Sequence, residues 1–288
     1  MTSFKIFRGL STVRRALRHW PLWLCLLALS GCSTGLRLAY NHLDTLATWQ
    51  IGNLVKLEAP QKAVFKAAFQ SLWDWHRQTQ LPLYAADLRQ LAATVEQEGL
   101  DQKSISAFID KIDHHTETLW RKAEPDVVRL IASLNDAQVE HFLVQQRKDI
   151  EKMEAEHRDE TPQQRRKRYL KTTAENSDAW LGKLNAAQQA RIERNWDENL
   201  ATLPSPEQRR QENLDEIERL AGLLATRQQP GLDQRLRHFN DAADNDDRKK
   251  RDEAMRLDVY ALIDASQRKH LHARLLELAS DFDKLTTR

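Results

Sequence analysis

The sequence predicts an all-α protein, an elongated multi-helix bundle of about nine to eleven helices without a β-sheet. Glycine and proline together contribute only 16 of 288 residues, about half of the share that is usual in globular chains. Apolar residues recur every three or four positions, and no segment alternates with period two over a useful length. A β-sandwich or barrel would need more turn residues. With 41% apolar and 30% charged residues, the composition also excludes collagen-like, low-complexity and integral-membrane classes.

Residues 1–31 have the composition of an export signal. They contain five basic residues and no acidic one, and an apolar run from Trp20 to Leu29 follows the basic part. A run of about ten residues is too short for a bilayer core, which needs about 20. A basic segment before a short apolar run is typical of a secretory signal peptide, so we expect residues 1–31 to be removed.

The end of this segment, Leu29-Ser30-Gly31-Cys32, resembles the lipobox of bacterial lipoproteins. The resemblance implies that a signal peptidase recognises Leu29, Ser30 and Gly31, and that Cys32 carries a covalent diacylglycerol and an N-acyl chain. The alternative is an ordinary export signal with an incidental cysteine, but no A-x-A-like cleavage site lies nearby. By the sorting rule of Gram-negative lipoproteins, Ser33 in place of Asp implies the outer membrane. No other cofactor is expected.

The mature chain, from Cys32 onward, has 39 basic and 42 acidic residues, a net charge of −3. The second cysteine of the sequence, Cys25, lies in the predicted signal peptide, so we expect neither a free thiol nor an intrachain disulfide. We expect residues 32–35 to form a lipidated tether and residues 36–288 a single helical periplasmic domain. Several acyl chains suffice for stable membrane attachment.

The spacing of the apolar residues outlines the helices in order. The expected stripes run from Leu36 to Leu54, Val64 to Trp73, Tyr84 to Val95, Phe108 to Leu119 and Val127 to Leu134. A C-terminal stripe alternates steps of four and three, which is typical of a coiled-coil seam; it consists of Leu271, Leu275, Leu278, Phe282 and Leu285. Boundaries are expected at Pro60, Pro82, Gly99, Pro125, Pro162, Pro204, Pro206, Pro230 and Gly231.

Residues 154–168 differ from the rest because they are crowded with charge and lack large apolar side chains. We expect a solvated helical hairpin that projects from the bundle. The run from Arg165 to Arg168 would suit nucleic acid in another setting, but an exported protein meets little of it, so no nucleic-acid partner is expected.

A helix-start pattern recurs along the chain: an apolar residue, a capping residue, and glutamine three positions later. The capping residue and glutamine are Asn135 and Gln138, Asn185 and Gln188, and Asp264 and Gln267, with a looser copy at Glu58 and Gln61. This spacing is that of a capping box, in which each side chain bonds the backbone N–H of the other residue. Four unrelated helix starts are the alternative interpretation.

Together, these copies resemble the LTxxQ motif of the periplasmic stress-chaperone family that includes Spy and CpxP. Threonine is the usual second residue in that family, whereas this chain has Asn, Asp or Glu. The resemblance implies a helical, cradle-like dimer that binds unfolding proteins without ATP.

Three further segments occur in a recognisable order: R-L-A-Y-N at 37–41, W-H-R at 75–77 and L-P-x-Y-A at 81–85. With the lipobox before them, they resemble a family of uncharacterised helical lipoproteins of proteobacteria. The resemblance extends from residue 25 to about residue 285, and it implies an architecture and a location but no activity.

No motif in the sequence predicts catalysis or metal binding. It contains no Gly-rich phosphate loop, no G-x-S-x-G and no H-E-x-x-H. Glu154 and His157 form one Glu-x-x-His, but a di-iron bundle needs two such motifs and two further glutamates. We therefore expect neither an enzyme nor a metal site.

Four residues are candidates for partner binding: Trp73, Trp75, His76 and Tyr84. Exposed tryptophan and tyrosine near arginine are favoured in interface hot spots. The alternative is aromatic packing around a turn at Pro82.

We expect a non-enzymatic lipoprotein on the periplasmic face of the outer membrane. In the leading hypothesis it binds other envelope proteins, including unfolded clients, as an ATP-independent chaperone-like factor. The alternative is a scaffold or regulator with one dedicated folded partner. The sequence leaves the partner and the oligomeric state open.

Overall fold

The computed structural model describes residues 40, 42–97, 100–200, 204–242 and 247–286. This part of the chain consists of α-helices and one π-helical segment and contains no strand, which confirms the all-α class. The elements are α4 (Leu43–Val55), α5 (Ala59–Trp75), the π-helical η2 (His76–Gln80), α6 (Leu81–Gln97), α7 (Gln102–Ala132), α8 (Asp136–His157), α9 (Pro162–Leu181), α10 (Ala186–Asn199), α11 (Pro206–Ala225), α12 (Leu232–Ala242), α13 (Asp247–Ala261) and α14 (Ala265–Thr286).

Two predictions about the N-terminus lie outside the described residues. These are the signal peptide, residues 1–31, and the lipid attachment at Cys32 with its recognition residues Leu29, Ser30 and Gly31. Among the described helices, none combines the length and the apolar character that crossing a bilayer requires.

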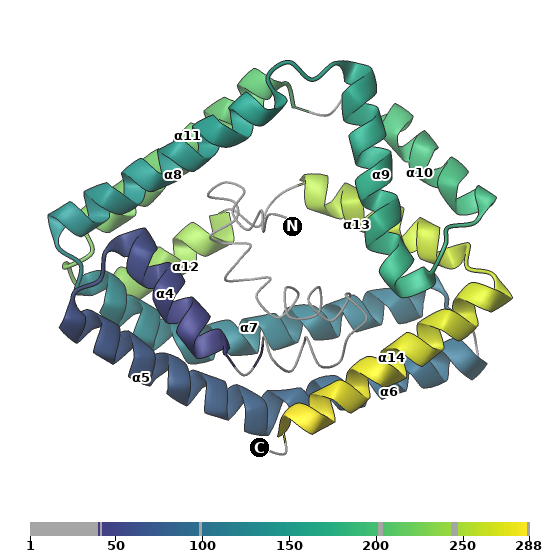
Figure 1. Cartoon of the computed structure of the whole chain (residues 1–288), viewed down its shortest axis with the longest axis horizontal. Coiled ribbons are helices and arrows are strands. Elements are labelled where there is room, and N and C mark those ends of the chain that lie inside the picture. The colour runs from purple at the N-terminus through teal and green to yellow at the C-terminus, as the bar shows by residue number, and fades with distance from the viewer. Residues whose placement is uncertain (1–39, 41, 98–99, 201–203, 243–246, 287–288) are drawn as a thin grey trace.

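The helices are arranged as the sides of an open frame (Figure 1). One side is the pair α8 and α11, and another contains α10, which contacts both α9 and α13. The lower sides in this view are α5, with α4 and α7 against it, and the long pair α6 and α14. Arg89 forms an ion pair with Asp283, and His272 lies 3.6 Å from Glu96. α6 and α14 are therefore antiparallel.

The buried apolar residues form separate clusters along this frame. The largest lies where α5, α6 and α14 meet, and it includes the predicted C-terminal seam. Each of the five seam residues is at most 4% exposed. Midway along the pair α8 and α11, one small cluster has Ile150 and Ile217 as its buried members. The core is thus thick beside α14 and thin on the opposite side.

Two prolines that we expected to end helices do not. α7 continues through Pro125 from Gln102 to Ala132. An interior proline costs about 3 kcal/mol. Here the flanking turns of α7, which include Trp120 and Ile131, pack against the buried Leu223 cluster of α11 and α12. Tertiary packing on both sides of Pro125 therefore outweighs the local penalty.

The turn that we expected at Pro82 is also absent, because the helix passes from α5 to α6 through η2. The Leu81 N–H bonds to the carbonyl of His76, five residues back, which is the bonding pattern of a π-helix. In a regular α-helix the ring of Pro82 would clash with the carbonyl four residues back and break the helix. The extra residue in the π-helical turn relieves this clash.

Residues 154–168 form the corner between α8 and α9, at the top of Figure 1. Arg166 lies 3.2 Å from Glu193 of α10, and Arg210 of α11 lies 3.6 Å from Glu154. This polar segment therefore lies at a corner of the frame, where ion pairs join it to two neighbouring helices, α10 and α11.

Candidate functional site

The candidate functional site surrounds η2. We call the side chains of Tyr40, Trp73, Trp75, His76 and Tyr84 the aromatic site. His76 is 1% exposed, and its Nδ1 lies 3.0 Å from the Tyr40 hydroxyl in a shared hydrogen bond. The Trp73 ring stacks on His76 with centroids 5.1 Å apart, and Tyr40 lies 4.2 Å from the same indole. Three rings from two segments thus form a packed base beneath η2.

The base of the aromatic site is neutral. Burial, with a smaller contribution from the charge of Arg77, lowers the pKa of His76 to about 3. Burial also raises the pKa of Tyr40 above its usual range. Among the described residues, neither His76 Nε2 nor Trp73 Nε1 has a hydrogen-bond partner. Burial thus keeps His76 uncharged near neutral pH, and its ring packs against those of Tyr40 and Trp73.

The outer part of the aromatic site reaches the surface. Trp75 is half-buried, and the ammonium of Lys122 lies 5.7 Å from its ring centroid. Tyr84 is also half-buried, with its ring edge against His115 at 4.6 Å. Leu83, beside Tyr84, is 50% exposed.

These exposures correct the predicted binding set. Trp73 and His76 lie in the core, and the half-buried Tyr84 packs on His115 and Phe282 with its hydroxyl oxygen buried, whereas Trp75 remains partly accessible. Leu83 joins Trp75, and sequence reasoning missed Leu83 because the extra residue in η2 shifts the helix phase. A straight α-helical register from Trp73 would have placed different residues of α6 outward.

A polar cluster next to Tyr84 ties α6 to α7. Asp87 accepts hydrogen bonds from Lys111 at 2.6 Å and pairs with His115 at 2.7 Å. Burial alone would raise the pKa of Asp87, but these two hydrogen bonds outweigh it and hold the pKa below its usual value. The residues described in the structure bring no three histidine, cysteine or acidic side chains together in a metal-binding group.

The four predicted helix starts dock on one another in two pairs. In the first cap pair, Glu58 and Gln61 of α5 meet Asn135 and Gln138 of α8. Gln61 donates to the Gln138 amide oxygen at 3.1 Å, and Gln138 donates in return at 2.7 Å. Asn135 donates to the Glu58 carboxylate at 3.1 Å. Each member of this pair therefore serves its own helix and the facing one.

The second cap pair joins Asn185 and Gln188 of α10 to Asp264 and Gln267 of α14. Gln267 donates to the Gln188 amide oxygen at 2.8 Å and to the Lys183 carbonyl at 3.0 Å. Asn185 donates to the Leu262 carbonyl at 3.0 Å. The two cap pairs lie at opposite corners of the frame (Figure 1).

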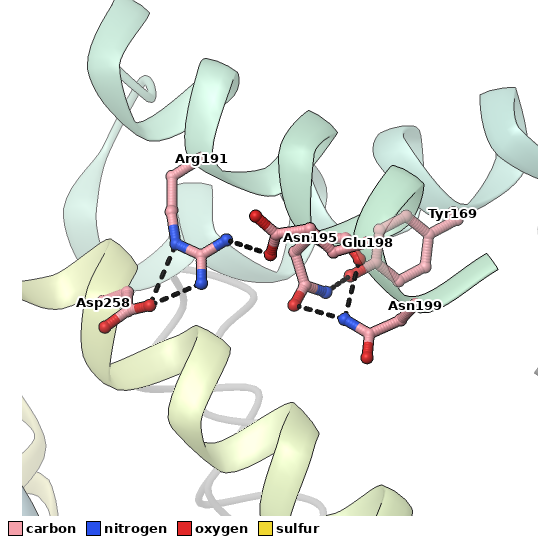
Figure 2. A network of polar contacts seen from close by, with 6 residues as sticks. All are labelled: Tyr169, Arg191, Asn195, Glu198, Asn199 and Asp258. Carbon is pink, nitrogen blue, oxygen red and sulfur yellow. Dashed lines mark hydrogen bonds and ion pairs between the residues drawn. The ribbon is translucent and has the colours of Figure 1, made fainter. Parts of the chain in front are cut away.

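A further network braces α10 next to the second cap pair (Figure 2). Arg191 reaches Asp258 of α13 with Nε at 2.9 Å and Nη2 at 2.6 Å. On the other side of α10, Asn195 donates to the hydroxyl of Tyr169 on α9 at 2.9 Å. Together these bonds fix α10 between its two neighbours.

Comparison with known proteins places the chain in a family. No curated protein and no solved structure matches it. The model of the DUF6279 family, a family of unknown function, matches residues 53–245. This range is more than half of the chain and includes η2 and the first cap pair. The chain therefore belongs to the DUF6279 family of unknown function.

Proposed function

We propose that this protein is a non-enzymatic, lipid-anchored protein of the outer membrane that binds other envelope proteins through the surface over η2. One observation carries the proposal: the half-buried Trp75 and the exposed Leu83 flank a π-helical turn whose base is packed and neutral. π-helical turns are frequent at functional sites, and a rigid base lowers the entropy cost of presenting contact residues to a partner.

The location in this proposal rests on the N-terminal sequence. The basic segment, the short apolar run and the lipobox-like Leu29-Ser30-Gly31-Cys32 support export and lipidation. A Cys32→Ala variant should accumulate as unprocessed precursor and lose its mature, lipid-anchored form. Normal processing of this variant, seen by gel mobility and mass spectrometry, would contradict the lipid anchor.

The exposure pattern favours a folded partner over unfolding clients. An unfolding chain needs a contiguous apolar surface, whereas the large exposed apolar residues here are distributed over several helices. They are Leu46 and Trp49 on α4, Val64 on α5, Leu83 on α6, Leu200 after α10, Leu262 before α14 and Leu276 on α14. Separate small patches suit specific docking.

Site-specific crosslinking tests this function. A photoreactive amino acid replaces Leu83 in the full-length protein, and a matched control replaces Leu276, which is 41% exposed on α14. We expect one dominant crosslinked envelope protein from position 83 and none from position 276. Equal yields from both positions would contradict a binding surface over η2.

A second measurement separates the two kinds of partner. If unfolding proteins are the clients, the chain from residue 33 onward should suppress aggregation of a denatured protein at near-stoichiometric ratio. We expect no suppression, since we favour a folded partner. A broad set of crosslinked clients together with strong suppression would favour the chaperone version.

A further inference from the structure

We propose that the face formed by α4 and α5 rests on a phospholipid surface, with Trp49 at the level of the headgroups and two lysines on their phosphates. The inference rests on the lipid anchor proposed at Cys32. It concerns a different face from the one proposed to bind proteins, because the aromatic site lies at the other end of α5.

Trp49 is an unusual surface residue in this molecule. Its side chain is 67% exposed, and Leu46, one turn earlier on α4, is 50% exposed. On the adjoining helix, Val64 is 59% exposed, although we expected it to face the core. Val64 lies two residues from both Lys62 and Lys66 and therefore on another side of α5, so the apolar part of the proposed membrane face consists of Leu46 and Trp49. Tryptophan prefers membrane interfaces because its ring is apolar and its N–H is polar.

An open groove of about 300 Å³ runs between α4 and α5 beside Trp49. It is lined by Thr45, Thr48, Trp49, Gly52, Asn53, Lys62 and Lys66. Lys62 lies across α4 at Gly52, where an added Cβ would come within 3.3 Å of the lysine Cε. Glycine at this position therefore gives the lysine stem room against α4.

The charge of the groove fits an anionic lipid. Its lining contains two lysines and no acidic residue, since Asp44, Glu58 and Asp74 of the same helices lie outside it. Lysine can lay its methylene stem on apolar surface while its ammonium reaches a phosphate. Each lysine at an anionic surface contributes about fivefold to binding. A tryptophan and a leucine flanked by such lysines form the amphipathic surface that lies in a membrane interface.

The position of this face in the chain also fits. Ten residues lie between Cys32 and Leu43, the first residue of α4. A linker of this length spans at most about 40 Å. A lipid on Cys32 would therefore hold the start of α4 within that distance of the bilayer, and a short linker gives its neighbour a high effective concentration at the surface.

Vesicle binding tests the inference without the anchor. The chain from residue 33 onward retains every described element, because the first residue that the structure describes is Tyr40. It is mixed with vesicles of phosphatidylcholine alone, or with one third phosphatidylglycerol, that contain acyl chains brominated near the headgroup. We expect sedimentation with the anionic vesicles and quenching of tryptophan fluorescence. Trp49→Phe should abolish the quenching, and quenching that persists in this variant would overturn the proposal.

The lysines have their own matched control. Lys62→Gln with Lys66→Gln should weaken binding to the anionic vesicles about thirtyfold. Lys103→Gln with Lys269→Gln changes two exposed lysines elsewhere and should leave binding unchanged. Equal effects of the two pairs, or equal binding to neutral vesicles, would overturn the inference. Crosslinking from position 83 and processing at Cys32 are separate readouts, so failure here is distinguishable from failure of the proposed function.

Discussion

The two cap pairs follow one plan but are stabilised differently. In the first, Gln61 and Gln138 exchange both amide hydrogen bonds, but Gln61 is half-buried. In the second, a single amide bond joins Gln267 to Gln188, and these glutamines are 4% and 0% exposed. The first pair is stabilised by two reciprocal amide hydrogen bonds. The second is stabilised by one amide hydrogen bond between two buried glutamines.

The first pair has an additional brace. Arg227, from the turn after α11, is 6% exposed and donates to the Leu134 carbonyl at 2.7 Å and to Asp136 at 2.6 Å. A cap pair with one half-buried glutamine, Gln61, is thus supported from the turn after α11. The comparison indicates that one local motif can form either a braced joint or a joint with both glutamines buried.

The largest expected effect on stability comes from replacing one glutamine of each pair by alanine. Gln188→Ala should lower the free energy of unfolding by about 3 kcal/mol, because it removes a helix cap at about 1 kcal/mol and two buried hydrogen bonds, with Gln267 and the Val259 carbonyl, at about 1 kcal/mol each. Gln61→Ala should cost about 1 kcal/mol, since water reaches the groups that it exposes. Urea unfolding followed by far-ultraviolet circular dichroism measures both values.

The control for this comparison is Gln164→Ala. Gln164 forms an exposed capping box with Thr161. Both hydrogen bonds of this box stay within α9 and its cap, and neither reaches another helix. Its loss reports the local cap alone, at about 1 kcal/mol or less. If Gln188→Ala costs no more than Gln164→Ala, burial does not distinguish the second cap pair.

The pH dependence of stability distinguishes the aromatic site from the cap pairs. Neither pair contains histidine, whereas the folded chain holds the pKa of His76 at about 3 through burial and the Arg77 charge. In the unfolded chain histidine titrates near pH 6.5. Below that value His76 is protonated in the unfolded state but not in the folded state, so the free energy of unfolding falls as the pH falls. Between pH 7 and pH 5, His76 should lower the free energy of unfolding by about 2 kcal/mol.

His76→Phe isolates this contribution because phenylalanine keeps the stacking on Trp73 without a titrating group. The variant should lose about 2 kcal/mol less than the native chain between pH 7 and pH 5. Gln188→Ala should keep the native pH dependence. Parallel pH profiles for the native chain and His76→Phe would show that His76 is not held neutral.

The local parts of this structure were predictable and the tertiary parts were not. The spacing from Asn135 to Gln138 predicts a capping box, because both hydrogen bonds lie within one helical turn. Nothing local to that turn indicates that it docks on Gln61, 77 residues away. The capping boxes at Thr161 and Ser205 escaped notice because no apolar residue precedes them.

The candidate site shows the same division. The aromatic cluster could be found from its composition, but which rings are exposed depends on η2. Its single extra residue rotates α6 relative to α5, so Leu83 faces outward. Likewise, Val64 fits the apolar stripe of α5 by spacing, yet the neighbouring helices pack only along Phe65, Phe69 and Trp73. Spacing identifies an apolar face, and the partner helix decides how wide the buried part is.

The smallest expected difference distinguishes the cap residues. Asn135→Asp and Asn185→Asp both keep an oxygen that accepts from the first turn, and aspartate caps as well as asparagine. Asp at position 135 would face the Glu58 carboxylate at an exposed site, which should cost about 0.5 kcal/mol. At position 185 it would turn an oxygen toward the Leu262 carbonyl and the Gln267 amide oxygen in a half-buried joint, which should cost about 1.5 kcal/mol.

Urea unfolding at 0.05 and 0.5 M sodium chloride distinguishes the two variants. Salt should restore the stability of Asn135→Asp, because it screens exposed charge, and should leave Asn185→Asp destabilised. Full rescue of both would mean that the second joint is as open to solvent as the first.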